Sequence, residues 1–307
     1  MIWLLLILIA ILVIPVITER LRNPMDEDAR RKAPGQFATL SQGITHYEWL
    51  GPQRGPVAVC IHGLTTPSFV WRGVARGLAL MGFRVLVYDL FGRGYSDRPS
   101  GPQDSAFFLR QLNDLLEREG VGDDITVIGY SMGGAIATAF AATSPGRVRQ
   151  LILLAPAGMG SIAGKLTSFI IRTPLVGDWL MLALYPTQLR RGLRAERDVP
   201  TSVEEIGRMQ DAELDWRGFV PAVLSSLRGM LSEVRKSDHE RLQRAGIPVL
   251  AIWGSVDTVI PLAAVGTLTK WNRKTRQEVI SGAGHGLPYT HTDDVLHHIR
   301  EFIREPD

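Results

Sequence analysis

One serine of the chain lies in a setting that suits nucleophilic chemistry. Ser131 is the centre of Gly129-Tyr-Ser-Met-Gly133, directly after the apolar run 125–128. A G-x-S-x-G pentapeptide between a strand and a helix predicts a sharp turn that lifts the serine hydroxyl out of the sheet. Glycines suit the flanking positions because such a turn leaves little room for side chains. Residues 134–142 are mostly small and apolar and predict the helix that the turn requires. Ser131 is therefore the candidate nucleophile.

A serine nucleophile needs a base, and the base needs an orienting carboxylate. Asp257 follows the apolar run 249–253, and His285 lies in a glycine-rich loop after the predicted strand 276–280. In an open parallel sheet, the loops after the carboxyl ends of the strands face one crevice. We therefore expect Ser131, Asp257 and His285 to converge at one edge of the sheet.

The elements that must position these residues alternate between strands and helices. This alternation predicts an α/β fold with a mainly parallel central sheet and helices on both faces. The predicted strands are 37–40, 44–49, 57–61, 84–88, 125–129, 148–154, 249–253 and 276–280, and the helices that separate them include 69–81, 104–119, 262–271 and 292–303. Residues 157–245 break the rhythm with helical patterns and almost no strand signal, which predicts a helical lid inserted into the sheet domain.

Two further blocks accompany the pentapeptide and the loops of Asp257 and His285. His62-Gly63-Leu64 follows the third predicted strand, and a block at 89–99 (DLFGRGYSDRP) follows the fourth. With these five blocks in order, the chain resembles the α/β-hydrolase fold superfamily. It is most similar in character to serine hydrolases with a helical lid, such as esterases and monoacylglycerol lipases. The order Ser, Asp, His is also the chain order of that family's triad. The similarity runs from about residue 37 to the end and is weakest across the lid.

The resemblance implies a role for each matching residue. Ser131 would attack an acyl carbonyl, His285 would take its proton, and Asp257 would orient the imidazole. The backbone N–H groups of Leu64 and Met132 would bind the oxyanion. Gly129 and Gly133 would shape the turn at Ser131, called the nucleophile elbow. Gly63 would shape the loop that carries Leu64, called the oxyanion loop.

Other residues of these blocks suit structural roles. His62 is expected to support the oxyanion loop, and Asp89 and Asp97 to fix the loop after the fourth strand. Gly92-Arg-Gly94 is too short and misplaced for a dinucleotide loop. The sequence shows no cluster of His, Cys and carboxylate residues that would predict a metal site, and we expect no cofactor.

Composition narrows the class of protein. Of the 307 residues, 45% are apolar and 21% are charged, which is typical of a folded domain. The formal charge is only +3, and no basic cluster is interleaved with aromatic residues, so nucleic acid is not an expected partner. Cys60 is the one cysteine, which excludes an intrachain disulfide, and its apolar surroundings predict a buried side chain.

The amino terminus predicts contact with a membrane. Residues 2–17 are all apolar, no lysine or arginine precedes them, and no small-residue cleavage site follows. These features favour an uncleaved anchor over residues 1–18, or an uncleaved signal, rather than a cleaved signal peptide. The basic residues that follow are Arg20, Arg22, Arg30, Arg31 and Lys32. By the positive-inside rule, they predict that the catalytic body lies on the cytoplasmic side.

The expected organisation is an anchor at 1–18, a linker at 19–36, a hydrolase core at 37–156 and 246–307, and a lid at 157–245. Two apolar stretches of the lid, 161–171 and 175–185, either only pack against the core or line an acyl pocket. An anchor beside an apolar lid favours a small-molecule ester substrate with a hydrophobic or lipid-like acyl group. The oligomeric state stays open.

Three alternatives to ester hydrolysis remain from sequence. Serine relatives of the same fold cleave carbon–carbon bonds of ring-fission products, and others act as cofactor-free peroxidases. A third alternative is a membrane-anchored binding protein that has lost catalysis. Dehalogenases and epoxide hydrolases of this fold carry aspartate at the elbow, so Ser131 argues against both.

Overall fold

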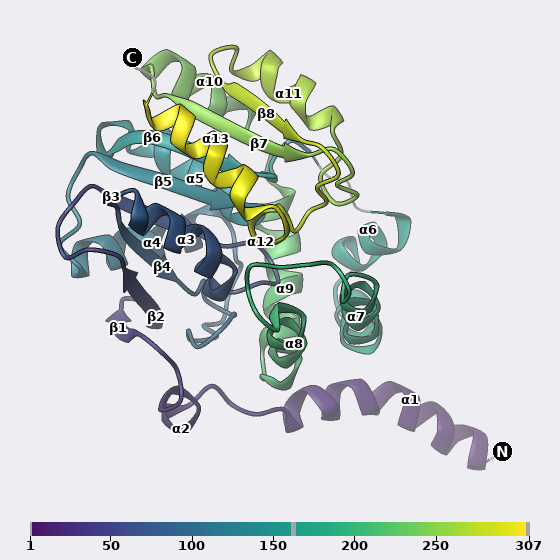
Figure 1. Cartoon of the computed structure of the whole chain (residues 1–307). Coiled ribbons are helices and arrows are strands. Elements are labelled where there is room, and N and C mark those ends of the chain that lie inside the picture. Colours follow the sequence, from purple (N-terminus) through teal and green to yellow (C-terminus); the bar gives the residue numbers. More distant parts are fainter. Residues whose placement is uncertain (1, 161–163, 305–307) are drawn as a thin grey trace.

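The computed structural model describes residues 2–160 and 164–304, without the side chains of residues 6–9, and contains an eight-stranded sheet (Figure 1). The strands lie in the order β1-β2-β4-β3-β5-β6-β7-β8. The β1–β2 and β2–β4 pairs are antiparallel, and all other pairs are parallel. The strands are β1 (Gln36–Leu40), β2 (Gly43–Leu50), β3 (Val57–Ile61), β4 (Arg84–Tyr88), β5 (Ile125–Tyr130), β6 (Val148–Leu154), β7 (Val249–Gly254) and β8 (Arg276–Ile280). Each predicted strand is present, with its ends within one residue of the prediction.

Helices cover both faces of this sheet, as predicted. One face packs against α3 (Arg72–Leu80), α12 (Leu287–Thr290) and α13 (Thr292–Arg304), and the other against α4 (Ser105–Arg118), α5 (Met132–Thr143), α10 (Lys236–Ala245) and α11 (Ala263–Trp271). Side chains of β3 alternate between the two layers: Val59 and Ile61 join one core cluster, and Ala58 and Cys60 join the other. All six residues of β5 are buried, as expected of a central parallel strand.

The lid consists of helices with a small core of their own. They are α6 (Lys165–Arg172), α7 (Val176–Ala195), α8 (Ile206–Ala212) and α9 (Phe219–Arg228). Ile170, Met181 and Phe219 are buried in this lid core. By contrast α10, which lies inside the range predicted for the lid, packs against α5 and α11, and its Leu242 joins the main core. We therefore place α10 with the sheet domain. Residues 161–163 of the predicted lid, residue 1 of the predicted anchor and residues 305–307 of the predicted core lie outside the described residues.

The amino-terminal helix α1 (Ile2–Leu21) is long and apolar enough to cross a membrane, a property that a signal sequence shares. The segment expected as a linker, 19–36, contacts the lid at its amino end and the sheet domain at Arg30 and Pro34. Its first residue, Glu19, accepts a hydrogen bond from the backbone N–H of Gly218 at 2.6 Å. Asn23 forms a β-bridge with Trp216. The segment also contains the short helix α2 (Glu27–Arg30). A charged, proline-containing sequence predicts irregular backbone, but it does not reveal such contacts.

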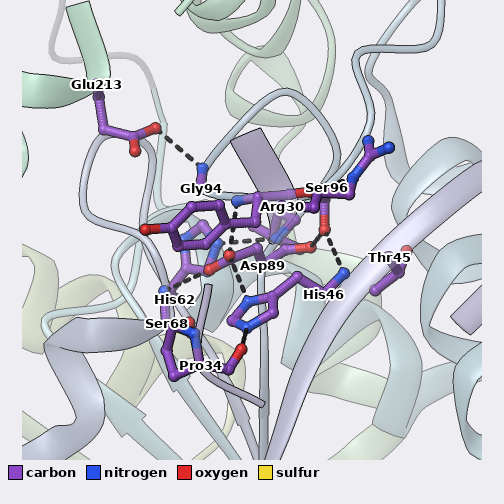
Figure 2. A network of polar contacts seen from close by, with 12 residues as sticks. Arg30, Pro34, Thr45, His46, His62, Ser68, Asp89, Gly94, Ser96 and Glu213 are labelled. Atoms are coloured by element: carbon purple, nitrogen blue, oxygen red, sulfur yellow. Dashed lines mark hydrogen bonds and ion pairs between the residues drawn. The ribbon is translucent and has the colours of Figure 1, made fainter. Parts of the chain in front are cut away.

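A buried ion pair holds the loop after β4 (Figure 2). Asp89 Oδ2 lies 2.8 Å from His46 Nδ1 and also accepts from the N–H of Tyr95, while Oδ1 accepts from the N–H of Ser68. Burial alone would raise the pKa of Asp89, but the hydrogen bond and charge of His46 outweigh it and lower that pKa. A Cβ on Gly94, whose φ is +51°, would lie 2.1 Å from Asp89 Oδ2. The predicted structural role of Asp89 is confirmed.

Candidate active site

The turn between β5 and α5 holds Ser131 in a strained conformation. Its φ of 53° and ψ of −118° are rare for a residue other than glycine. A Cβ on Gly133 would lie 2.0 Å from the carbonyl oxygen of Ile61, and one on Gly129 would lie 2.3 Å from that of Gly133. Glycine is required at both positions because backbone segments approach so closely. The turn presents the Ser131 hydroxyl at the carboxyl end of the sheet.

The three residues predicted to converge do so. His285 Nε2 lies 2.9 Å from Ser131 Oγ, and His285 Nδ1 lies 2.8 Å from Asp257 Oδ2. The other carboxylate oxygen of Asp257 accepts from the N–H groups of Val259 and Ile260 at 2.7 and 2.8 Å. Because a carboxylate only accepts hydrogen bonds, Nδ1 of His285 must donate, which leaves Nε2 to accept the serine proton. This is the tautomer that general-base catalysis requires.

Tyr130 helps to hold His285 in position. Its hydroxyl donates to the backbone carbonyl of His285 at 3.0 Å, and the two ring centroids lie 5.3 Å apart. A Cβ on Gly254 would lie 2.4 Å from the carbonyl oxygen of Ala283, so the loops after β7 and β8 touch. Tyr130 was not predicted from the sequence. Its one signal was a hydroxyl at the variable position before Ser131.

The loop after β3 passes directly against the serine. A Cβ on Gly63 would lie 3.2 Å from Ser131 Cβ. Within residues 2–160 and 164–304, the backbone N–H groups of Leu64 and Met132 donate to no other protein group. Two free N–H groups on either side of a serine hydroxyl can bind a developing oxyanion.

His62 fixes this loop in its neutral form. Its Nε2 lies 2.8 Å from the backbone nitrogen of Leu90 and must accept, because an N–H only donates. Nδ1 therefore carries the proton and donates to the carbonyl oxygen of Gly63 at 2.8 Å. Complete burial lowers the pKa of His62 to about 4, so the ring stays neutral at physiological pH. A proton-transfer role is excluded by these two contacts, and the predicted supporting role fits them.

Arg93 is a second residue that the sequence analysis missed. Its guanidinium is fully buried and donates from Nε to the carbonyl oxygen of Leu64. It also donates to Gln103 Oε1 and Ser226 Oγ, which joins the oxyanion loop to helix α9. The pattern Gly92-Arg-Gly94 belongs to the block at 89–99, and nothing in it indicates that the arginine is buried.

A cavity of about 870 Å³ opens onto Ser131 and His285 between the core and the lid. Apolar side chains from both parts line it, among them Leu64, Met159, Ile171, Leu227, Leu231, Ile260 and Ala264. A second cavity of about 700 Å³ also reaches His285, and charged lid residues line it, among them Arg190, Arg194, Glu196, Glu205 and Arg208. Polar side chains, among them Arg172 and Gln188, also line the first cavity, so His285 borders one mainly apolar space and one with many charged residues.

One group in the described part of the chain has the spacing of metal ligands. His297, His298 and Glu301 bring their ligand atoms within 4.8 Å of one another on α13. This group was not predicted from the sequence. Glu301 is paired with Arg276 at 3.1 Å and with His297 at 3.3 Å, and none of the three lines either cavity. We interpret the group as a surface ion-pair network.

Comparisons with known proteins agree with this architecture. A protein-family model described as alpha/beta hydrolase fold matches residues 56–292. An uncharacterised protein of Mycobacterium tuberculosis is 31% identical over 294 residues, covering 87% of this chain and 80% of that protein. A 2-hydroxymuconate semialdehyde hydrolase of Pseudomonas putida is 28% identical over 235 residues, covering 73% of this chain and 78% of that protein. Among solved structures, a thermophilic esterase from Thermogutta terrifontis superposes with a TM-score of 0.71 at 23% identity, covering 89% of this chain and 98% of the esterase.

Proposed function

The chain belongs to the α/β-hydrolase fold family, and from this premise we propose that it is a serine hydrolase that cleaves carboxylic esters with hydrophobic acyl chains. The observation that carries the proposal is the hydrogen-bonded series from Ser131 Oγ through His285 to Asp257, with distances of 2.9 and 2.8 Å. An acyl-transfer site needs a serine, a histidine whose Nε2 can accept the serine proton, and a carboxylate that is held by hydrogen bonds. All three are present here.

The geometry supports an acyl-enzyme mechanism. Ser131 Oγ attacks the ester carbonyl carbon as its proton passes to Nε2 of His285. The negative charge on the carbonyl oxygen is stabilised by the N–H groups of Leu64 and Met132, each worth about 3 kcal/mol in a well-studied protease. The C–O bond to the alcohol then breaks, and the alcohol leaves with the proton from His285. Water, deprotonated by His285, attacks the acyl-enzyme and releases the acid and Ser131.

The substrate class follows from the apolar cavity. Its lining mixes residues of the core, such as Leu64, with residues of the lid, such as Ile171 and Leu227, so an acyl chain would be buried between the two. Each buried methylene contributes about 0.8 kcal/mol of transfer free energy. Longer acyl chains are therefore expected to bind more tightly until the cavity is filled.

We also propose that α1 anchors the protein to a membrane with the hydrolase body on the cytoplasmic side. Its mean hydropathy of 2.8 over a membrane-spanning window supports the anchor. The basic residues that follow α1 support the orientation. A fusion to a reporter that is active only outside the cytoplasm tests it, and strong reporter activity on the carboxyl-terminal side would refute this orientation.

Hydrolysis of a carbon–carbon bond is the second candidate function. The hydrolase of Pseudomonas putida supports it by similarity. The charged cavity at His285 also favours it, because Arg194 in its lining suits a carboxylate of ring-fission products. The test compares hydrolysis of a vinylogous diketone with hydrolysis of the esters. A higher rate of carboxylic acid release from the diketone than from any ester would establish carbon–carbon bond hydrolysis instead.

The test uses the full chain in detergent micelles with p-nitrophenyl acetate, octanoate and palmitate. We expect the octanoate and palmitate to give a higher kcat/KM than the acetate, and Ser131→Ala to lose all turnover. A fluorophosphonate probe should label the wild type and leave Ser131→Ala unlabelled. Retained esterase activity in Ser131→Ala would refute the assignment of Ser131 as the nucleophile. A wild type that the probe does not label would favour a binding protein without catalysis.

A further inference from the structure

Four large apolar side chains at the junction of α6 and α7 are exposed to solvent. Leu166, Phe169, Leu175 and Val176 expose 56%, 49%, 83% and 53% of their surface. We call these four residues the lid edge. An apolar group of this size on the outside of a protein indicates a contact surface rather than a solvated face.

The α7 end of the lid edge lies beside the apolar helix α1. Trp179, three residues after Val176, donates from Nε1 to the backbone carbonyl of Leu12 in the middle of α1 at 2.9 Å. Figure 1 shows α1 passing beneath α7. Val176 of the lid edge and the apolar side chains of α1 therefore face the same surroundings, and α6, which carries Leu166 and Phe169, packs against α7.

A second contact fixes α1 at its carboxyl end. The N–H of Asn23 donates to the carbonyl of Asp215 at 3.0 Å, and the N–H of Arg217 donates to the carbonyl of Asn23 at 2.8 Å. Glu19 accepts from the N–H of Gly218. Because α1 is held at its middle and at its end, its position relative to the lid is fixed. A medium that surrounds α1 therefore also contacts the lid.

We propose that the partner of the lid edge is the lipid bilayer itself, which the lid edge enters together with α1. Burial of these four side chains in lipid would stabilise this arrangement, because it removes their apolar surface from water. Lys165 is exposed at the amino end of α6, where its charge suits phosphate headgroups.

The position of α6 gives this surface a role in the reaction, which rests on the proposed function of the apolar cavity. Thr167, Ser168 and Ile171 of α6 line the cavity, whereas Leu166 and Phe169 are exposed on the outside. One helix, about 10 Å across, therefore separates lipid from the acyl site. An ester in the bilayer would reach Ser131 past α6 without crossing water.

The single native cysteine makes the insertion measurable. Cys60 is fully buried, and burial raises the pKa of its thiol, so a spin label reacts only with an introduced cysteine. Phe169→Cys and Val176→Cys report on the lid edge. Leu80→Cys is the matched control, because Leu80 is 86% exposed at the end of α3.

The labelled full-length variants are reconstituted in vesicles of phosphatidylcholine and phosphatidylglycerol. We expect labels at Phe169 and Val176 to collide more with oxygen and less with a nickel chelate than the label at Leu80. Equal nickel accessibility at all three positions would overturn the proposal. This readout does not depend on catalysis, so it stands or fails separately from the esterase assignment.

A kinetic experiment tests whether the ester passes from the bilayer to Ser131 along α6. Leu166→Glu and Val176→Glu place an acid in the first turn of a helix, where it is compatible with folding. Together they should lower hydrolysis of a long-chain ester embedded in vesicles by about tenfold or more, because charged side chains resist insertion. Hydrolysis of soluble p-nitrophenyl acetate should not change. If the double variant hydrolyses both substrates as fast as the wild type, delivery of the ester past α6 is excluded. If the wild type hydrolyses neither substrate, the proposed esterase function is refuted instead.

Discussion

Arg93 donates from Nε to the backbone carbonyl oxygen of Leu64 at 3.0 Å, directly beneath the loop that would bind the oxyanion. The guanidinium is fully buried and has no ion pair within the described residues. Burial lowers the pKa of Arg93 to about 9, so it remains charged at neutral pH. Its partners are carbonyl, amide and hydroxyl oxygens, including Ser226 Oγ of α9 at 2.8 Å. One side chain therefore positions the Leu64 N–H relative to the lid.

Arg93→Met keeps the length of the side chain and removes its donors. We expect kcat to fall by about 10- to 100-fold with a smaller change in KM, because the oxyanion contact strengthens only in the transition state. Steady-state kinetics with p-nitrophenyl octanoate, normalised to fluorophosphonate-labelled sites, measure the effect. Arg147→Met is the control, because Arg147 also donates to a backbone carbonyl, that of Val121, away from the cavities. Equal losses in both variants would indicate general destabilisation.

Asp257→Asn should preserve the fold and disrupt the tautomer. The amide can present N–H to Nδ1 of His285, which would move the imidazole proton to Nε2 and remove the base. We expect kcat to fall by about 10³–10⁴-fold at neutral pH. Asp124→Asn, at the exposed partner of Arg149 and away from both cavities, serves as control and should retain activity. A loss in Asp257→Asn of less than about tenfold would argue that another carboxylate orients His285.

The sequence predicts what depends on local pattern and misses what depends on contacts between distant segments. Buried parallel strands such as β3, β5 and β7 have long apolar runs that reveal them, and the more exposed strands β1, β2 and β8 were also located. The convergence of Ser131, Asp257 and His285 follows from strand direction alone. The packing of α10 does not, because a lid helix and a crossover helix share one periodicity. Nor does the burial of Arg93, since its partners Gln103 and Ser226 come from later segments.

Gly133→Ala should prevent normal formation of the elbow. The added Cβ would lie 2.0 Å from a backbone carbonyl oxygen, which cannot move without displacing β3. We expect a loss of folding free energy of at least about 2–3 kcal/mol, as for other overpacked core positions. Thermal unfolding followed by circular dichroism measures it. Gly146→Ala is the control, because a Cβ there meets nothing within 4 Å. Similar melting temperatures for both variants would show that the elbow tolerates a methyl group.

Glu213 is a buried acid that links the lid to the loop after β4 (Figure 2). It lies in a short 3-10 helix between α8 and α9, and its Oε2 accepts from the N–H of Gly94 at 2.9 Å. Burial raises the pKa of Glu213 to about 7, although the charge of Arg98 and the Gly94 hydrogen bond oppose this shift. The carboxyl is therefore protonated more readily in the folded than in the unfolded protein.

The pKa of Glu213 predicts how stability depends on pH. Below about pH 4.5 the carboxyl is protonated in both states and carries no penalty. Between about pH 4.5 and 7 the folded state binds more protons than the unfolded state, so this group lowers stability as pH rises. Glu213→Gln keeps an acceptor for Gly94 and removes the charge. We expect it to be more stable than wild type by about 1–3 kcal/mol at pH 8 and equal at pH 4.5, by urea unfolding at each pH. A constant difference across this range would mean that Glu213 does not titrate there.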